Sequence, residues 1–228
     1  MKQRILELDF LRGLAVLGMI IFHFFFILDF LNIQQHAMYE SGWLILARAV
    51  QFSFLTLVGI GITFSRNNTK RGLIVLVAAL IITLATYISE PTLYVRFGIL
   101  HFIAISILIL KPIKKLKYTV LLLAATALLI DYFISQISSA NLFFIILGFQ
   151  PQGFATLDYF PIFPWISLPL IGIYLGNTIY KNRTPVISNK FFQFRHILFL
   201  GRHALVIYLL HIPLIYGVLL LWLFSNVK

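Results

Sequence analysis

The sequence predicts an all-α integral membrane protein, a bundle of about seven transmembrane helices with a cytoplasmic N-terminus and a C-terminus outside. Of its 228 residues, 61% are hydrophobic and 11% are charged, whereas soluble domains carry about 25% charged residues. Long apolar runs recur along the chain, and the basic residues concentrate in alternate loops. The length fits one domain, so we expect residues 1–228 to form a single transmembrane domain.

Seven apolar runs are long enough, or nearly so, to cross a hydrocarbon layer of roughly 30 Å. They cover residues 10–32, 43–65, 72–89, 97–111, 118–137, 160–180 and 203–224. A further run at 142–149 is too short to span, which predicts an interfacial or re-entrant outer segment over residues 138–159. The basic stretch 181–202 is interleaved with Phe residues and predicts an amphipathic segment along the inner surface.

The basic residues give the predicted orientation. Most of the 18 Lys and Arg residues lie near the N-terminus and in the segments 66–71, 111–117 and 181–202, whereas the opposite loops hold only Arg96. By the positive-inside rule the basic segments face the cytoplasm. The net charge of +11 is therefore a topology signal, and we expect no nucleic-acid partner. The chain has no Cys, which excludes thiolate metal sites, and we expect no bound metal.

The first apolar run carries ionisable side chains at membrane depth. At 100° per residue, the residues Asp9, Arg12, Val16, Met19 and His23 fall within an arc of about 80°, so the polar groups share one helix face. An ionisable group near the centre of a bilayer costs roughly 2.5–3.5 kcal/mol or more, which makes such a residue a functional candidate. Arg12 is also compatible with snorkelling or with pairing to Asp9, and His23 with an interhelical hydrogen bond.

Other runs place further polar side chains within the membrane. His101 and His211 lie in the fourth and seventh runs, which with His23 predicts one polar cavity that opens outward. The candidate lining residues are Arg48, Arg96, His101, Asp158, Trp165 and His211. At the inner ends, Arg202 and His203 join Arg12 where an anionic cytoplasmic ligand would bind, although His203 also suits contact with headgroups. On these residues alone, an enzyme and a transporter or channel remain alternatives, and a non-catalytic membrane subunit is a third.

Several short motifs in order along the chain carry a family resemblance. They are the segment from Arg4 to Ala15 with His23, then Gly98-Ile99-Leu100-His101, Asp158-Tyr159-Phe160-Pro161 with Pro164-Trp165, Gly201-Arg202-His203 and Ile207-Tyr208-Leu209-Leu210-His211. Together they resemble the heparan-α-glucosaminide N-acetyltransferase catalytic-domain family over most of the chain. The spacing of eleven residues from Arg12 to His23 also resembles the acyltransferase-3 group, in which the equivalent Arg and His belong to the active site.

The resemblance implies a membrane-embedded acyltransferase. Such an enzyme moves an acyl group, typically acetyl, from cytoplasmic acetyl-CoA or another acyl-CoA to a sugar amine or hydroxyl on the extracytoplasmic side. We therefore expect acyl-CoA, a sugar or glycan acceptor and the lipid bilayer as partners, in a multi-pass protein of a prokaryotic plasma membrane, and a homodimer is compatible with this. The alternative remains a polytopic transporter or channel that uses its buried His and Arg side chains.

The resemblance also suggests roles for individual residues. The lysosomal enzyme of the family has an active-site His, followed by Ala, in the loop after the span that here holds His23, and His36-Ala37 is similar to it. That enzyme has Asn where this chain has His23. The catalytic residue is therefore open between His23 and His36. We predict His23 as the general base, because neutral His suits proton abstraction, and His36 as an acceptor-side contributor. The predicted donor-binding residues are Asp9, Arg12, Arg202 and His203.

Overall fold

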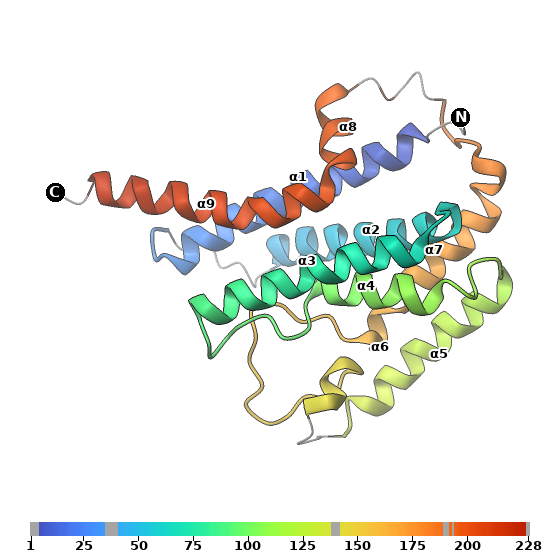
Figure 1. Cartoon of the computed structure of the whole chain (residues 1–228), viewed down its shortest axis with the longest axis horizontal. Coiled ribbons are helices and arrows are strands. Elements are labelled where there is room, and N and C mark those ends of the chain that lie inside the picture. Colours follow the sequence, from blue (N-terminus) through green and yellow to red (C-terminus); the bar gives the residue numbers. More distant parts are fainter. Residues whose placement is uncertain (1–4, 35–40, 138–141, 189–191, 193, 227–228) are drawn as a thin grey trace. The chain divides into compact units, whose positions relative to one another are not determined.

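The computed structural model describes residues 5–34, 41–137, 142–188, 192 and 194–226, and this part of the chain is all-α (Figure 1). The helices are α1 Leu6–Phe30, α2 Ser41–Phe64, α3 Asn68–Ser89, α4 Ile99–Leu110, α5 Tyr118–Ile134, η1 Leu142–Ile146, α6 Ile162–Trp165, α7 Ser167–Thr178, η2 Lys181–Arg183, α8 Arg195–Arg202 and α9 Ala204–Asn226. The all-α prediction is therefore confirmed.

Each of the seven apolar runs contains a helix. In the described part of the chain, four helices are long and apolar enough to cross a membrane, namely α1, α2, α3 and α9. The shorter apolar helices are Ile99–Leu110, Tyr118–Ile134 and Ile162–Thr178. These helices make the chain a multi-pass integral membrane protein. The count of seven spans and their orientation stay predictions.

The chain forms two compact units, and each is described by itself. Unit 1 comprises Met1–Phe54 and Thr184–Lys228, and unit 2 comprises Leu55–Arg183. The helix α2 begins in unit 1 and ends in unit 2.

Unit 1 is organised by a close crossing of α1 and α8. A Cβ atom added to Gly13 would lie 2.0 Å from the carbonyl oxygen of Ile197, and one added to Gly201 would lie 1.9 Å from the carbonyl oxygen of Asp9. Backbone therefore meets backbone at this crossing, as in other close contacts between membrane helices. The helix α9 begins directly after α8 and runs beside α1 (Figure 1).

Two further contacts hold unit 1 together beyond the crossing. The buried Glu7 carboxylate accepts hydrogen bonds from the backbone N–H groups of Val186 at 2.9 Å and Ile187 at 2.7 Å, which ties the segment before α8 to the start of α1. Towards the other end of α1, Ile27 and Leu28 form an apolar cluster with Leu219 of α9. The start of α1 is thus tied to the segment before α8, and its other end packs against α9.

Unit 2 contains a short paired segment next to α4. The backbone N–H of Leu157 donates to the carbonyl of Leu93 at 2.8 Å, and that of Phe160 donates to Phe97 at 2.9 Å. The helix α4 has 12 residues and is therefore only about 18 Å long, less than the hydrocarbon thickness. The backbone that precedes so short a helix also needs hydrogen-bond partners within the protein, and this pairing supplies them.

The basic segments of unit 2 gather at one end of its helices. Lys114 donates to the carbonyl oxygen of Ser65 at 3.0 Å, and Lys111 donates to Thr69 at 2.9 Å. The guanidinium of Arg183 donates to the carbonyl of Phe64, the last residue of α2. Cations thus bind carbonyl groups that a helix C-terminus leaves without intrahelical partners. Segments 66–71, 111–117 and 181–183, which the charge pattern predicts to face the same way, therefore lie close together.

The glycine crossing yields a test of stability. Gly13→Ala and Gly201→Ala should each destabilise the protein, by about 1–3 kcal/mol, because the added methyl group meets backbone that cannot rotate away. Thermal unfolding in detergent measures the effect. Gly217→Ala is the matched control, since a Cβ atom there has nothing within 4 Å and α9 should tolerate it. Equal unfolding temperatures for all three variants would contradict this packing.

Candidate active site

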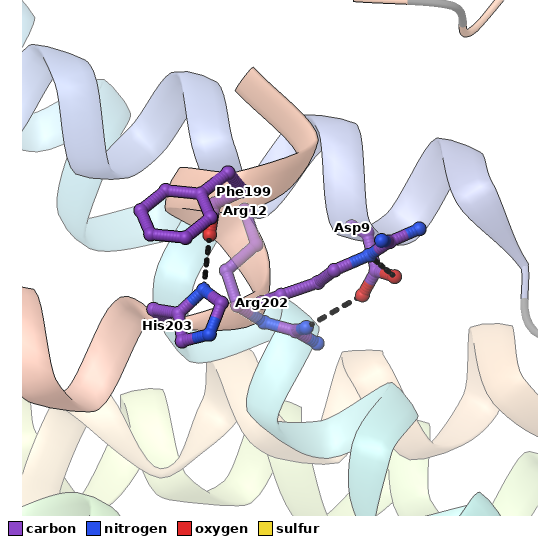
Figure 2. A network of polar contacts seen from close by, with 5 residues as sticks. All are labelled: Asp9, Arg12, Phe199, Arg202 and His203. Carbon is purple, nitrogen blue, oxygen red and sulfur yellow. Dashed lines mark hydrogen bonds and ion pairs between the residues drawn. The ribbon is translucent and has the colours of Figure 1, made fainter. Parts of the chain in front are cut away.

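A charged cluster lies where α8 crosses α1 (Figure 2). Arg12 Nη1 donates to Asp9 Oδ1 at 3.2 Å, and Arg202 Nε lies 3.7 Å from Asp9 Oδ2. The Asp9 residue is 4% exposed, whereas the Arg202 side chain is 42% exposed. One buried carboxylate thus holds two guanidinium groups, and the three groups together carry an excess positive charge. Such a cluster attracts anions, and guanidinium groups match the geometry of phosphate oxygens.

The pairing of Arg12 with Asp9, one of the alternatives that the sequence left open, is present, and Arg202 extends it. The close approach at Gly201 brings the next residue, Arg202, over Asp9. His203 follows at the end of α8, where its Nδ1 lies 2.9 Å from the carbonyl oxygen of Phe199 and its ring packs on the Phe199 ring (Figure 2). The His203 side chain is exposed, so both contact with headgroups and contact with a ligand remain open to it.

A pair of histidines lies further along the same two segments of unit 1. His23 Nδ1 on α1 lies 3.2 Å from His211 Nε2 on α9, with the ring centroids 4.8 Å apart. His23 Nδ1 is also 2.9 Å from the carbonyl oxygen of Met19. His23 is half-buried and His211 is 5% exposed. The interhelical hydrogen bond expected of His23 is present, and its partner is another membrane-depth histidine.

Two other candidates belong to this part of the sequence. Arg48 is exposed on α2 and donates to Gln51 of its own helix at 3.0 Å. His36, the alternative catalytic residue, lies outside the described residues, and its role stays a prediction.

In unit 2, His101 joins α4 to α3. The Thr83 hydroxyl donates to the carbonyl oxygen of Val95 at 2.8 Å, and it lies 3.3 Å from His101 Nε2. The Thr83 hydroxyl proton lies in the hydrogen bond to Val95, so the Thr83 oxygen acts as the acceptor for His101 Nε2–H. In a neutral His101 ring, Nδ1 is then the unprotonated nitrogen. His101 is 7% exposed. Its Nε2 thus supports the fold, and its Nδ1 is the nitrogen with a lone pair.

Asp158 caps the N-terminus of α4. Its Oδ2 accepts the backbone N–H of Ile99 at 2.8 Å, and a Cβ atom on Gly98 would lie 2.3 Å from this oxygen. Glycine at 98 therefore makes room for the carboxylate at the positive end of the helix. Loss of hydration raises the pKa of Asp158 from 3.8 to about 6, although backbone N–H groups of Ile99 and Tyr159 oppose the rise.

Arg96 lies within the paired segment, and Trp165 follows it in the sequence. The Arg96 guanidinium carbon is 5.0 Å from the Tyr94 ring and 5.4 Å from the Phe154 ring. Its buried Nε has no hydrogen-bond partner in the described structure. The Trp165 ring packs on Phe160 with centroids 4.7 Å apart. Arg96 is thus a cation held by aromatic faces rather than by a carboxylate.

The predicted site residues fall into two groups. Unit 1 brings together Asp9, Arg12 and Arg202, and it pairs His23 with His211. Unit 2 places Arg96, His101, Asp158 and Trp165 around the paired segment and the adjoining helices. A groove of about 560 Å³ on α3 is lined by Asn67, Thr69, Lys70, Leu73, Ile74 and Val77 and includes none of these residues. A single polar cavity formed by all the candidates stays a prediction.

Sequence reasoning missed several residues that shape these groups. Glu7 anchors the segment before α8, Thr83 holds His101, and Gly13 and Gly201 permit the crossing. The sequence did contain a clue to the two glycines, because each lies next to an arginine that was already a candidate. Within the described part of the chain, no group of three His, Asp or Glu side chains is arranged to hold a metal ion.

The fold and these side chains define a multi-pass membrane protein with a cationic cluster around one buried carboxylate and a histidine pair between two candidate membrane spans. The family described as heparan-alpha-glucosaminide N-acetyltransferase, catalytic, matches residues 4–213, so the chain belongs to this family. Membership implies membrane acetyltransferase activity with acetyl-CoA as the family's donor and an amine as the acceptor. Comparisons with curated proteins and with solved structures gave no match.

The raised pKa of Asp158 predicts a pH-dependent stability. The pKa of Asp158 is about 6 in the folded protein, whereas its ordinary value of 3.8 applies to the unfolded chain. Between these two pH values the folded protein therefore binds more protons than the unfolded chain. Stability should therefore fall as pH rises from about 4 to 6 and then level off. Asp158→Asn keeps an acceptor for Ile99 N–H but cannot titrate, so its unfolding temperature should fall less over this range. If the unfolding temperatures of the wild type and Asp158→Asn changed equally with pH, this account would be contradicted.

Proposed function

We propose that the protein transfers an acetyl or other acyl group from cytoplasmic acyl-CoA to a sugar amine or hydroxyl on the extracytoplasmic side of a prokaryotic plasma membrane. In this proposal residues 1–228 act as one transferase domain with the N-terminus inside. The supporting observation is that α1 carries both a cationic cluster and a histidine pair, each completed by the segment α8–α9.

The cationic cluster suits the donor. Acyl-CoA carries several phosphate groups, and Arg12 and Arg202 offer planar guanidinium groups around a single buried carboxylate. Asp9 orients both arginines, which makes it a positioning residue of this subsite. The exposed His203 ring adds a further polar contact at the same end of α1. The second arginine on Asp9 leaves the cluster with an excess positive charge, which suits a phosphate ligand.

The distance along α1 also suits the donor. Arg12 and His23 are eleven residues apart, which corresponds to roughly 16 Å of helix rise. CoA is an extended molecule with its phosphates at one end and its thioester at the other. The cluster would hold the phosphates, so the histidine pair lies at a depth where the other end of such a ligand would reach.

His23 is the proposed general base. Attack of an amine or hydroxyl on a thioester carbonyl requires the attacking group to lose a proton, and a neutral imidazole accepts it near neutral pH. The same proton can then pass to the leaving sulfur, which returns His23 to its starting state. We favour this direct transfer over an acyl-histidine intermediate.

The acceptor side is proposed to contain His36 together with residues of the outer loops and helix ends. The proposed lining residues are Arg48, Arg96, His101, Asp158, Trp165 and His211. Arg96 and Asp158 would provide a cation and a carboxyl group for a sugar acceptor. A homodimer is compatible with this arrangement.

A transporter or channel is the second candidate, because hydrogen-bonded histidines at membrane depth also suit proton movement. Acetyl-CoA binding separates the two candidates. Acetyl-CoA should raise the unfolding temperature of the detergent-purified protein, whereas ATP and free sugars should not, since stabilisation follows specific binding to the folded state. Absence of any effect of acetyl-CoA and CoA would contradict the transferase.

The role of Arg12 can be tested by a substitution that preserves charge. Arg12→Lys keeps the cation and its reach but loses the planar fork, so acetyl-CoA affinity should fall by about tenfold. Titration of the unfolding temperature with acetyl-CoA measures this. Arg195→Lys is the matched control, because Arg195 is an exposed arginine of α8 outside the cluster, and its affinity should equal that of the wild type. Equal affinities for all three proteins would favour Arg12 as a headgroup anchor.

The catalytic assignment can be tested on the two histidines. His23→Ala should lower turnover by about 10²–10⁴-fold while acetyl-CoA still stabilises the protein, because a general base acts on the chemical step. His36→Ala should lose less and should mainly raise the KM for the acceptor. Steady-state assays of acetyl transfer give both parameters. Loss of turnover in His36→Ala with only slowed turnover in His23→Ala would reverse the assignment.

A further inference from the structure

His211 has a more specific arrangement than a lining residue needs. Its Nδ1 lies 2.7 Å from the carbonyl oxygen of Tyr208 and 3.2 Å from that of Ile207, both on its own helix. A ring nitrogen that faces carbonyl oxygens carries the proton, because an oxygen lone pair accepts a hydrogen bond and cannot donate one. The Nε2 of a neutral His211 is therefore unprotonated, and this is the nitrogen that faces His23.

The same reasoning fixes the tautomer of His23. Its Nδ1 faces the Met19 carbonyl oxygen at 2.9 Å and the unprotonated His211 Nε2 at 3.2 Å. Both are acceptors, so His23 Nδ1 carries the proton and shares it between them. The remaining nitrogen, His23 Nε2, then has the free lone pair of a neutral ring.

We propose that His211 is a positioning residue that holds His23 with its Nε2 lone pair available as the base. This inference rests on the proposed function, and it names the basic atom and the group that orients it. When His23 Nε2 gains the acceptor's proton, the ring becomes a cation and its Nδ1–H bond to His211 becomes charge-assisted. His211 thereby stabilises the protonated form, as the third group of a catalytic triad does.

A neutral partner suits this position in a membrane. A carboxylate beside a neutral His23 would be an ion at membrane depth without a compensating charge, which is costly. The imidazole of His211 accepts the hydrogen bond without a charge of its own. The flanking contacts fix the distance between the rings, because the Gly13–Gly201 crossing lies on one side of the pair and the Ile27–Leu219 packing on the other.

Activity measurements test the positioning role. His211→Leu removes the acceptor and should lower kcat for acetyl transfer by about 10- to 100-fold, as expected for one hydrogen bond to a charged group. KM for acetyl-CoA should stay near that of the wild type. His211→Gln places an amide oxygen near the position of Nε2 and should restore most of the loss. His196→Leu, the same change at an exposed histidine of α8, should keep wild-type kcat.

These outcomes separate positioning from a structural role. Recovery of kcat in His211→Gln supports the proposal. Equal loss in the Leu and Gln variants, or wild-type kcat in His211→Leu, overturns it. Should His211→Leu fail to fold, the Gln variant and the spectroscopy of the wild type still decide the matter.

Nitrogen NMR tests the hydrogen bond without any activity. In protein labelled with ¹⁵N at its histidine rings, a scalar coupling should connect His23 Nδ1 and His211 Nε2 across the hydrogen bond. His23 Nε2 should give the signal of an unprotonated nitrogen, and the coupling should disappear in His211→Gln. A proton on His23 Nε2, or no coupling in the wild type, overturns the proposal even if the enzyme transfers acetyl groups. An intact coupling in a protein that transfers no acetyl group contradicts the proposed function instead.

Discussion

The backbone contact between α1 and α8 is the constraint on which the candidate site depends. Because neither Gly13 nor Gly201 has a side chain, the two helices approach until main-chain atoms touch. This approach brings Arg202 to Asp9, and it starts α9 beside α1 only two residues later. Running along α1, α9 then carries His211 to His23. A larger residue at either glycine would therefore disturb both the cationic cluster and the histidine pair, although they lie several helical turns apart.

The placement of charged and titratable side chains along α1 follows from the free-energy cost of ions in a membrane. Each buried carboxylate at the start of α1 has donors: Glu7 accepts two backbone N–H groups, and Asp9 holds two guanidinium groups. Deeper along the helix the polar groups are imidazoles, which satisfy one another and nearby carbonyl oxygens without a permanent charge. Fixed charge thus lies near the start of α1, and groups that can change charge lie further along the helix.

Sequence periodicity predicted much of this arrangement because it reports which residues share a helix face. The apolar runs gave the helices, and the 100° step placed Asp9, Arg12 and His23 together. Periodicity within one helix contains no information about its neighbour, so the pairing of His23 with a residue 188 positions away required the structure. Hydropathy likewise could not show that α4 begins only at Ile99, directly after a paired segment, because apolar residues occur in both. Family motifs supplied what periodicity lacks, since they join distant segments.

The use of one helix for both groups has a geometric consequence. The residues between them on the same face, Val16 and Met19, are fully or almost fully buried, so the face of α1 that carries Asp9 and His23 is packed along its length. A helix fixes both the rise and the rotation between two residues, and one inserted residue turns everything beyond it by 100°. The distance along α1 from the cluster to His23 is therefore set by helix geometry rather than by the packing of separate elements. In the proposed transferase this rigidity suits a donor of constant length, whereas the loops that would meet the acceptor need no such constraint.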